Sequence, residues 1–323
     1  MSSTVLSPEI MWYEQAANAA ASIGAMAYGI HIAVFYKCIT TLFRKNDKSF
    51  FKWIPFIAGL FVLGTANISC SLHFNQLAFI DERQYPGGPA AFLTEKQSDS
   101  ANVGAVATSI IMMIAADIFM IYRIHDLWRR TIVTGILSMT LLASIVMSGF
   151  HAVQLTRSKG SIGGASVIQF SVPYVSLATT LNILISVILL PRLLELRRQV
   201  SLTASLEGIQ NKFIGLEALV VESSLPSGLF SLVFIILFGF QKVSSILFLP
   251  LLVQVMGIMP GLIVLRIVQG YGWSNDTVRR LRPASSAYES SRRGPAENHH
   301  DQDVPLGGIG GTDPLRKNAN NFV

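Results

Sequence analysis

Long runs of apolar residues, separated by short polar segments, occupy the first 268 positions of the chain. A helix needs about 20 mostly apolar residues to cross a hydrocarbon core of roughly 30 Å, because no backbone amide can stay unpaired in lipid. Seven runs are long enough, so the pattern predicts an all-α membrane protein, a bundle of seven transmembrane helices. They cover residues 16–43, 54–80, 102–122, 131–153, 167–191, 213–240 and 244–268.

Residues 1–15 precede the first apolar run. They contain Glu9 and Glu14 but no Lys or Arg, so the basic start of a cleavable signal peptide is missing. We therefore expect a short extracellular N-terminus and a first helix that is retained in the membrane.

The composition agrees with a membrane protein. Hydrophobic residues make up 51% of the chain and charged residues only 14%, whereas soluble proteins carry about 25% charged residues. The net charge of +6 comes from cations spread among the loops, which does not favour a nucleic-acid partner. Walker, GxSxG, HExxH and CxxC motifs are absent from the sequence, and we expect no enzymatic activity.

The distribution of Lys and Arg predicts the orientation. Loops one, three and five contain eleven of these residues, against five in the second, fourth and sixth loops. Because cationic loops stay on the cytoplasmic side, the N-terminus should lie outside and the C-terminus inside. Residues 269–323 are rich in Gly, Pro, Ser, Asn and Arg, and we expect a disordered cytoplasmic tail.

Missing side chains exclude several chemistries. The run 244–268 has no lysine for a retinal Schiff base, so no such cofactor is expected. No His or His/Asp pair has the i, i+4 spacing of a zinc site, so no metal is expected either. Cys38 and Cys70 lie about 15 Å apart in depth at 1.5 Å per residue, which is too far for a disulfide.

Ionisable residues inside the predicted helices are costly, at about 2.5 to 3.5 kcal/mol at the bilayer centre, and so need a reason. Asp117, Glu222 and Arg266 fall in the cytoplasmic halves of the third, sixth and seventh helices. They are candidates for a charge network that acts as a two-state lock. The alternative is that the carboxyl groups are protonated and serve only as hydrogen-bonding contacts between helices. Asn182 lies on a polar stripe that suits either a cavity or packing.

Two further groups of residues are candidates for function. Pro226 and Pro260 interrupt the sixth and seventh helices and should kink them, because proline removes a backbone hydrogen bond. His73, Asn75 and His151 lie toward the outer side and are candidates for ligand contacts, although a hydrogen bond between helices would also satisfy each histidine.

Several short motifs lie along helices three to seven. They are Asp117-Ile-Phe-Met-Ile-Tyr122-Arg123 running to Trp128, Asn182 followed by Arg192, Glu222-Ser223, and Pro260-Gly-Leu-Ile-Val-Leu-Arg266 with Gly270. Together these motifs resemble a large family of seven-helix, receptor-like membrane proteins from mushroom-forming fungi. The resemblance implies the same seven-helix topology as the charge distribution and supplies no ligand. One departure is Pro226, where the family pattern has an aromatic residue after the Glu-Ser pair.

Three functions fit these features. The first is a receptor-like protein of the plasma membrane, in which a small-molecule or peptide ligand binds an outer pocket capped by the loop 81–101 and the cytoplasmic side contacts a signalling partner. The second is a transporter or channel for a small solute, proton or lipid, with Asp117 and Glu222 as relay groups. The third is a structural or trafficking membrane protein whose polar groups only hold the bundle together in the lipid bilayer.

Overall fold

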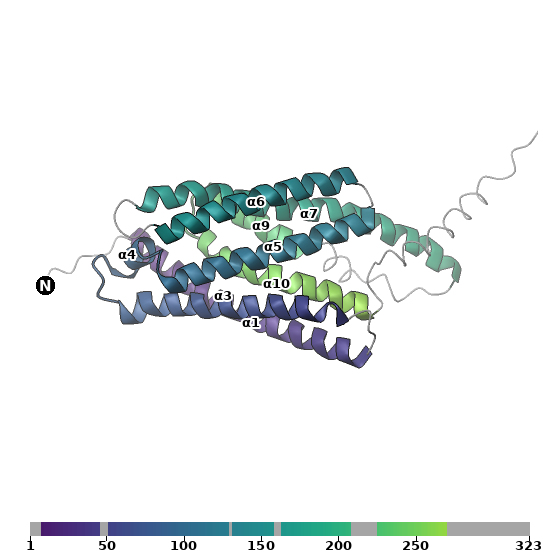
Figure 1. Ribbon diagram of the computed structural model, residues 1–323, viewed down its shortest axis with the longest axis horizontal. Coiled ribbons are helices and arrows are strands. Elements are labelled where there is room, and N and C mark those ends of the chain that lie inside the picture. Colours follow the sequence, from purple (N-terminus) through teal and green to yellow (C-terminus); the bar gives the residue numbers. More distant parts are fainter. Residues whose placement is uncertain (1–7, 46–50, 129–130, 158–162, 208–224, 270–323) are drawn as a thin grey trace, which may run out of the picture. The chain divides into compact units, whose positions relative to one another are not determined.

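The computed structural model describes residues 8–45, 51–128, 131–157, 163–207 and 225–269, all within one compact unit that spans 1–285. Every regular element among these residues is helical, as the sequence predicts (Figure 1). The long helices are α1 (Pro8–Lys45), α3 (Ile54–Gln76), α5 (Ser100–Trp128), α6 (Thr131–Arg157), α7 (Gly163–Glu207), α9 (Leu225–Gly239) and α10 (Ser245–Gln269). A π-helical turn, η1 (Leu77–Asp81), extends α3, and the short helix α4 (Gly88–Glu95) precedes α5.

The long helices pack in chain order into a closed ring. Each contacts the next along the sequence, and α10 returns to pack against α1. Helix α5 also contacts α10, so these two helices form the middle of the bundle. Most of the α10 side chains in its most apolar stretch are buried, which fits its strongly apolar sequence.

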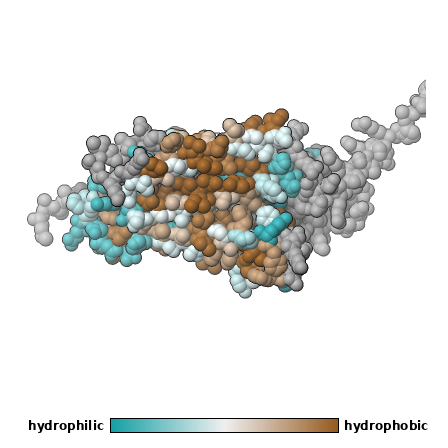
Figure 2. Space-filling model, viewed as in Figure 1, coloured by the Kyte–Doolittle hydropathy of each residue, from teal (hydrophilic) through white to brown (hydrophobic). Residues whose placement is uncertain are grey.

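The outside of the bundle is apolar. Figure 2 shows a broad hydrophobic belt across the middle of the visible face, with hydrophilic residues gathered toward the ends. Six of the described helices are long and apolar enough to cross a membrane, and all of the long helices expose large hydrophobic side chains. A soluble protein rarely exposes so continuous an apolar surface to water, so the chain is a multi-pass membrane protein in contact with lipid. Examples of these exposed hydrophobic side chains, one on each long helix, are Met26, Val62, Ile111, Met139, Val187, Ile236 and Leu249.

Several helices extend beyond the apolar runs. Helix α1 begins at Pro8, inside the segment predicted as the N-terminus, and α7 continues to Glu207 through residues predicted to form loop five. Hydropathy marks only the part of a helix that suits lipid, whereas Leu, Glu, Arg and Gln continue the same helix into water. Both helices are therefore longer than the predicted membrane spans 16–43 and 167–191, and the ends of those spans stay predictions.

The predicted sixth helix is described only in its second half. Helix α9 has 15 residues, or about 22 Å at 1.5 Å per residue, and residues 213–224 of the predicted run lie outside the described residues. Pro226 is the second residue of α9 as the structure describes it. Helix α10 continues through Pro260, and bending at either proline stays a prediction. The tail after Gln269 also lies outside the described residues.

The two cysteines are free, as their predicted depths required. Cys38 is buried, and its thiol donates a hydrogen bond to the carbonyl oxygen of Gly261 at 3.1 Å. This contact ties α1 to α10.

Candidate functional site

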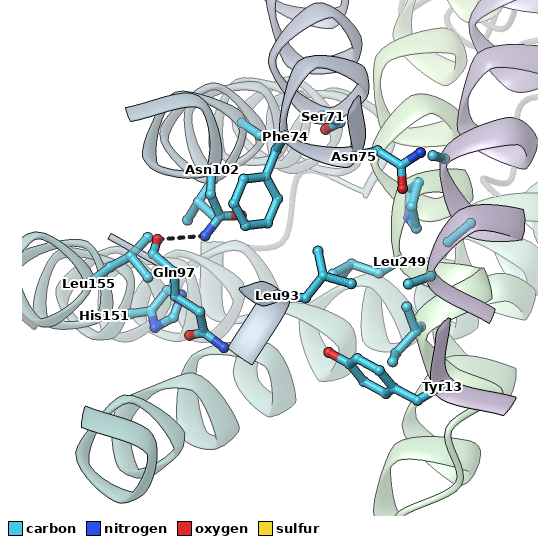
Figure 3. Close-up of a pocket in the computed structure, with 17 residues that line it drawn as sticks. Tyr13, Ser71, Phe74, Asn75, Leu93, Gln97, Asn102, His151, Leu155 and Leu249 are labelled. Atoms are coloured by element: carbon cyan, nitrogen blue, oxygen red, sulfur yellow. Dashed lines mark hydrogen bonds between the residues drawn. The ribbon is translucent and has the colours of Figure 1, made fainter. Parts of the chain in front are cut away.

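A pocket of about 400 Å³ opens between the helix ends that lie beside α4, which we call the α4 end of the bundle (Figure 3). Helices α1, α3, α5, α6 and α10 all contribute to its walls, and Leu93 of α4 also lines it. Its volume falls in the range of about 300 to 1,000 Å³ that is typical of small-molecule sites. The pocket therefore has the size and the many-helix lining of a ligand site.

Small side chains make room for the pocket on the α1 side. Ala17, Ala20 and Ala21 lie on one face of α1, because residues three and four apart in a helix are neighbours. Leu249 and Pro250 of α10 complete this apolar wall. A larger residue on this face of α1 would fill the space that the alanines leave.

Helix α4 is held against the pocket by a glycine turn and a hydrogen bond. Gly87 and Gly88 have φ angles of 89° and 78°, which favour glycine. The backbone N–H of Ala90 then donates to Glu14 Oε1 at 3.2 Å, which connects α4 to α1. These contacts place Leu93 in the pocket lining.

Tyr85, just before α4, donates a hydrogen bond from its hydroxyl to Glu95 Oε2 at 2.9 Å. This hydrogen bond, together with the negative charges of Glu95 and Glu82, raises the pKa of Tyr85 above its usual 10.0. The phenol therefore stays protonated at neutral pH and can continue to donate this bond, which links the two ends of the α4 segment.

Polar groups line the other side of the pocket. The side-chain amide of Asn102 donates to the carbonyl oxygen of Gln97 at 2.7 Å, as drawn in Figure 3, and Asn75 donates to Asn18 Oδ1 at 3.1 Å. His151 is only 8% exposed, and its Nδ1 has no hydrogen-bond partner among the described residues. Its ring stacks on Tyr174 of α7, with centroids 5.6 Å apart and an interplanar angle of 15°.

The structure brings together two of the three residues predicted to contact a ligand from the outer side. Asn75 and His151 both line the pocket. His73 is not among the lining residues, and its side chain is exposed on α3. His73 and Asn75 of α3 differ in their contact with the pocket because side chains two residues apart on a helix point to different faces. They therefore cannot both point into the bundle.

Asp117 lies deep in the bundle. Its side chain is 2% exposed, and Oδ1 has no hydrogen-bond partner among the described residues. Arg266 lies in the last turn of α10, while Glu222 lies outside the described residues, so the network of these three residues stays a prediction. The Asn182 amide donates to Ala178 O of its own helix at 3.0 Å, and it is 2% exposed.

A buried polar contact in the middle of the bundle was not anticipated from the sequence. Gln254 of α10 is 1% exposed; its Oε1 lies 3.2 Å from His31 Nδ1, and its amide donates to Gly64 O at 3.4 Å. It therefore joins α10 to both α1 and α3. The available signal was a lone glutamine in an otherwise apolar run, together with a histidine in the middle of the first helix.

Glycines allow these helices to approach His31. A Cβ on Gly64 or Gly257 would lie 2.9 or 2.8 Å from the His31 ring. Since such distances are too short for carbon atoms, both positions require a residue without a side chain. The imidazole thus occupies space that two glycines on neighbouring helices leave open.

Among the described residues, no group of three or more His, Cys, Asp or Glu side chains is arranged to hold a metal ion. Comparisons with protein-family models, curated proteins and solved structures found no match to this chain. The pocket and the buried polar groups are therefore the features of the chain that bear on its function.

Proposed function

We propose that this multi-pass membrane protein is receptor-like and binds a small molecule in the pocket at the α4 end. In this proposal α9, with the residues before it, forms the sixth of seven membrane-spanning helices. The α4 end faces the outside of the plasma membrane, and residues 269–323 face a cytoplasmic signalling partner. The ring of helices in chain order, the positions of Lys and Arg, and the resemblance to the fungal receptor-like family support it.

The observation that carries the proposal is the position of α10. Its first turns line the pocket at Ile246, Leu249 and Pro250, and the same helix continues to Gln269 at the opposite end of the bundle. A ligand that contacts one arrangement of α10 better than another shifts the population toward that arrangement. Occupancy at the α4 end then changes the environment of the other end.

The first prediction concerns variants that fill the pocket. The full-length protein in lipid nanodiscs carries a bimane fluorophore on Gln269→Cys, since Gln269 is exposed. Cys70 is replaced by alanine so that it does not react, whereas Cys38 is buried and can remain. Decanol, decanoate and decyltrimethylammonium are titrated in turn. We expect a saturable change in emission with at least one probe, and we expect Ala20→Trp to abolish it by filling the pocket.

The matched control is Ala33→Trp, which places the same indole on an exposed position of α1 away from the pocket lining. It should keep the response. Ala21→Trp is a second filling variant in case Ala20→Trp does not fold. A response that survives both filling variants, or no saturable response to any probe, would overturn the proposal.

The alternative function, a proton-coupled carrier, is favoured by one observation, the buried carboxyl of Asp117 without a partner at Oδ1. Intramembrane acids often relay protons. In liposomes with an imposed pH gradient, the receptor-like proposal predicts that the wild-type chain and Asp117→Asn give the same proton flux as empty vesicles. Flux in the wild-type chain that Asp117→Asn removes, measured with an internal pH dye, would establish the carrier instead.

A further inference from the structure

We infer that the pocket selects an uncharged amphiphile, a molecule with one hydroxyl or carbonyl oxygen at His151 and a hydrocarbon body against α1 and α10. This inference rests on the ligand-binding function proposed above and specifies the chemical class of the ligand. Three features of the pocket support it. They are the uncharged side chains of its described lining, the buried imidazole of His151 without a hydrogen-bond partner among the described residues, and the position of an apolar wall.

The described part of the pocket lining carries no charged side chain: none of the described lining residues is Asp, Glu, Lys or Arg. Glu14, on α1 near the pocket, accepts a hydrogen bond from Ala90 N. A carboxylate or an ammonium group that entered the pocket would meet no opposite charge among the described lining residues, which makes the loss of its water unfavourable. The lining therefore rejects ionised ligands.

His151 supplies an unused hydrogen-bonding edge. The side chain is more than nine-tenths buried and lines the pocket, and neither ring nitrogen makes a hydrogen bond with a described residue. Since Nδ1 is enclosed, a ligand that meets this imidazole would contact it at the edge that carries Nε2. A neutral imidazole has one donor and one acceptor, so it can pair with either a hydroxyl or a carbonyl group.

The orientation of the imidazole is fixed by its neighbour. Stacking on Tyr174 holds the ring from one side, and the Tyr174 hydroxyl is itself directed to Met113 Sδ at 3.9 Å. Because the ring has little freedom to turn away, its free edge is a preorganised contact for a ligand. The same ring connects the pocket to α5 and α7 in the interior.

One apolar wall of the pocket lies on different helices from His151, although Leu155 of α6 also lines the pocket. Ala17, Ala20 and Ala21 on α1 and Leu249 and Pro250 on α10 form an aliphatic surface, while His151 belongs to α6. A ligand with a polar end and a hydrocarbon body matches this separation. A wholly apolar molecule would leave His151 without a partner, and a wholly polar one would lose water at the alanine face.

The test uses photoreactive diazirine derivatives of decanol, decanoate and decyltrimethylammonium on the full-length protein in nanodiscs, with labelled peptides mapped by mass spectrometry. We expect the decanol derivative to label pocket peptides of α1 and α10 saturably, with competition by decanol. The two charged derivatives should bind at least about 10-fold more weakly. His151→Phe keeps an aromatic ring on Tyr174 but removes both nitrogens, and it should weaken decanol binding about 10-fold, or 1.4 kcal/mol.

His73→Phe is the matched control, because His73 is an exposed histidine outside the pocket lining and the same substitution there should leave binding unchanged. His151→Gln restores a hydrogen-bonding group and should recover part of the affinity if the contact is polar. Preferred labelling by a charged derivative, or full decanol affinity in His151→Phe, would overturn the inference while leaving the pocket as a binding site. Absence of saturable labelling by all three derivatives would overturn the proposed function as well.

Discussion

Gly228→Ala is expected to destabilise the bundle by about 3 kcal/mol, because a Cβ there would meet the closest contact of any described glycine. Gly228 of α9 packs directly against Ser186 of α7, and a Cβ at this position would lie 2.6 Å from the Ser186 Cβ. The Ser186 Cβ is fixed to the backbone and cannot turn aside, so the two helices must separate. Unfolding in mixed micelles with increasing sodium dodecyl sulfate, followed by circular dichroism, measures the loss.

A matched control lies in the same helix. A Cβ on Gly239 would have no atom within 4 Å, so Gly239→Ala should be neutral or slightly stabilising. The double variant Gly228→Ala with Ser186→Gly removes the colliding side chain and should regain most of the stability. If Gly228→Ala unfolds at the same detergent concentration as the wild-type chain, α9 does not pack on α7 in this way.

Gln254→Leu is expected to cost about 2 kcal/mol even though it places an apolar side chain of similar size in an apolar core. The substitution removes the partner of His31 Nδ1 and the amide that reaches Gly64 O. A buried polar group that loses its partner costs about 1 to 3 kcal/mol. The same detergent titration measures the effect.

Two comparisons separate this effect from a general loss of polarity. Gln76→Leu changes an exposed glutamine in the last turn of α3 and should be neutral. In a double-mutant cycle, His31→Leu combined with Gln254→Leu should cost less than the sum of the single variants, because no unpaired imidazole then remains. Additive costs would mean that the two side chains do not interact.

The position of Gln254 also bears on the proposed mechanism. It lies one helical turn after Pro250, which lines the pocket, and it connects α10 to α1 and α3. A ligand that moves the first turns of α10 therefore acts on the helix directly beside its main polar contact. Gln254→Leu should also alter the fluorescence response of the label at Gln269, if α10 transmits the change.

The sequence alone determined that this is a helical membrane protein. Apolar runs of about 20 residues require helices in lipid, whatever the packing, because the backbone has no other way to satisfy its hydrogen bonds. The same reasoning located six membrane-length helices, and it placed Asn75 and His151 at the end where the pocket lies. It did not show that α1 and α7 continue beyond the apolar runs, because polar helical turns have no hydropathy signal.

Which polar residues meet depends on the packing of the helices. His31 and Gln254 are 223 positions apart in the sequence, whereas His31 Nδ1 and Gln254 Oε1 lie 3.2 Å apart in space. This contact depends on the rotation of two helices and on Gly64 and Gly257 beside them. Periodicity could not separate the exposed His73 from the pocket-lining His151, since both lie toward the same side of the membrane. Hydropathy fixes the depth of a residue, whereas its direction around the helix axis is set by close packing between side chains that are distant in sequence.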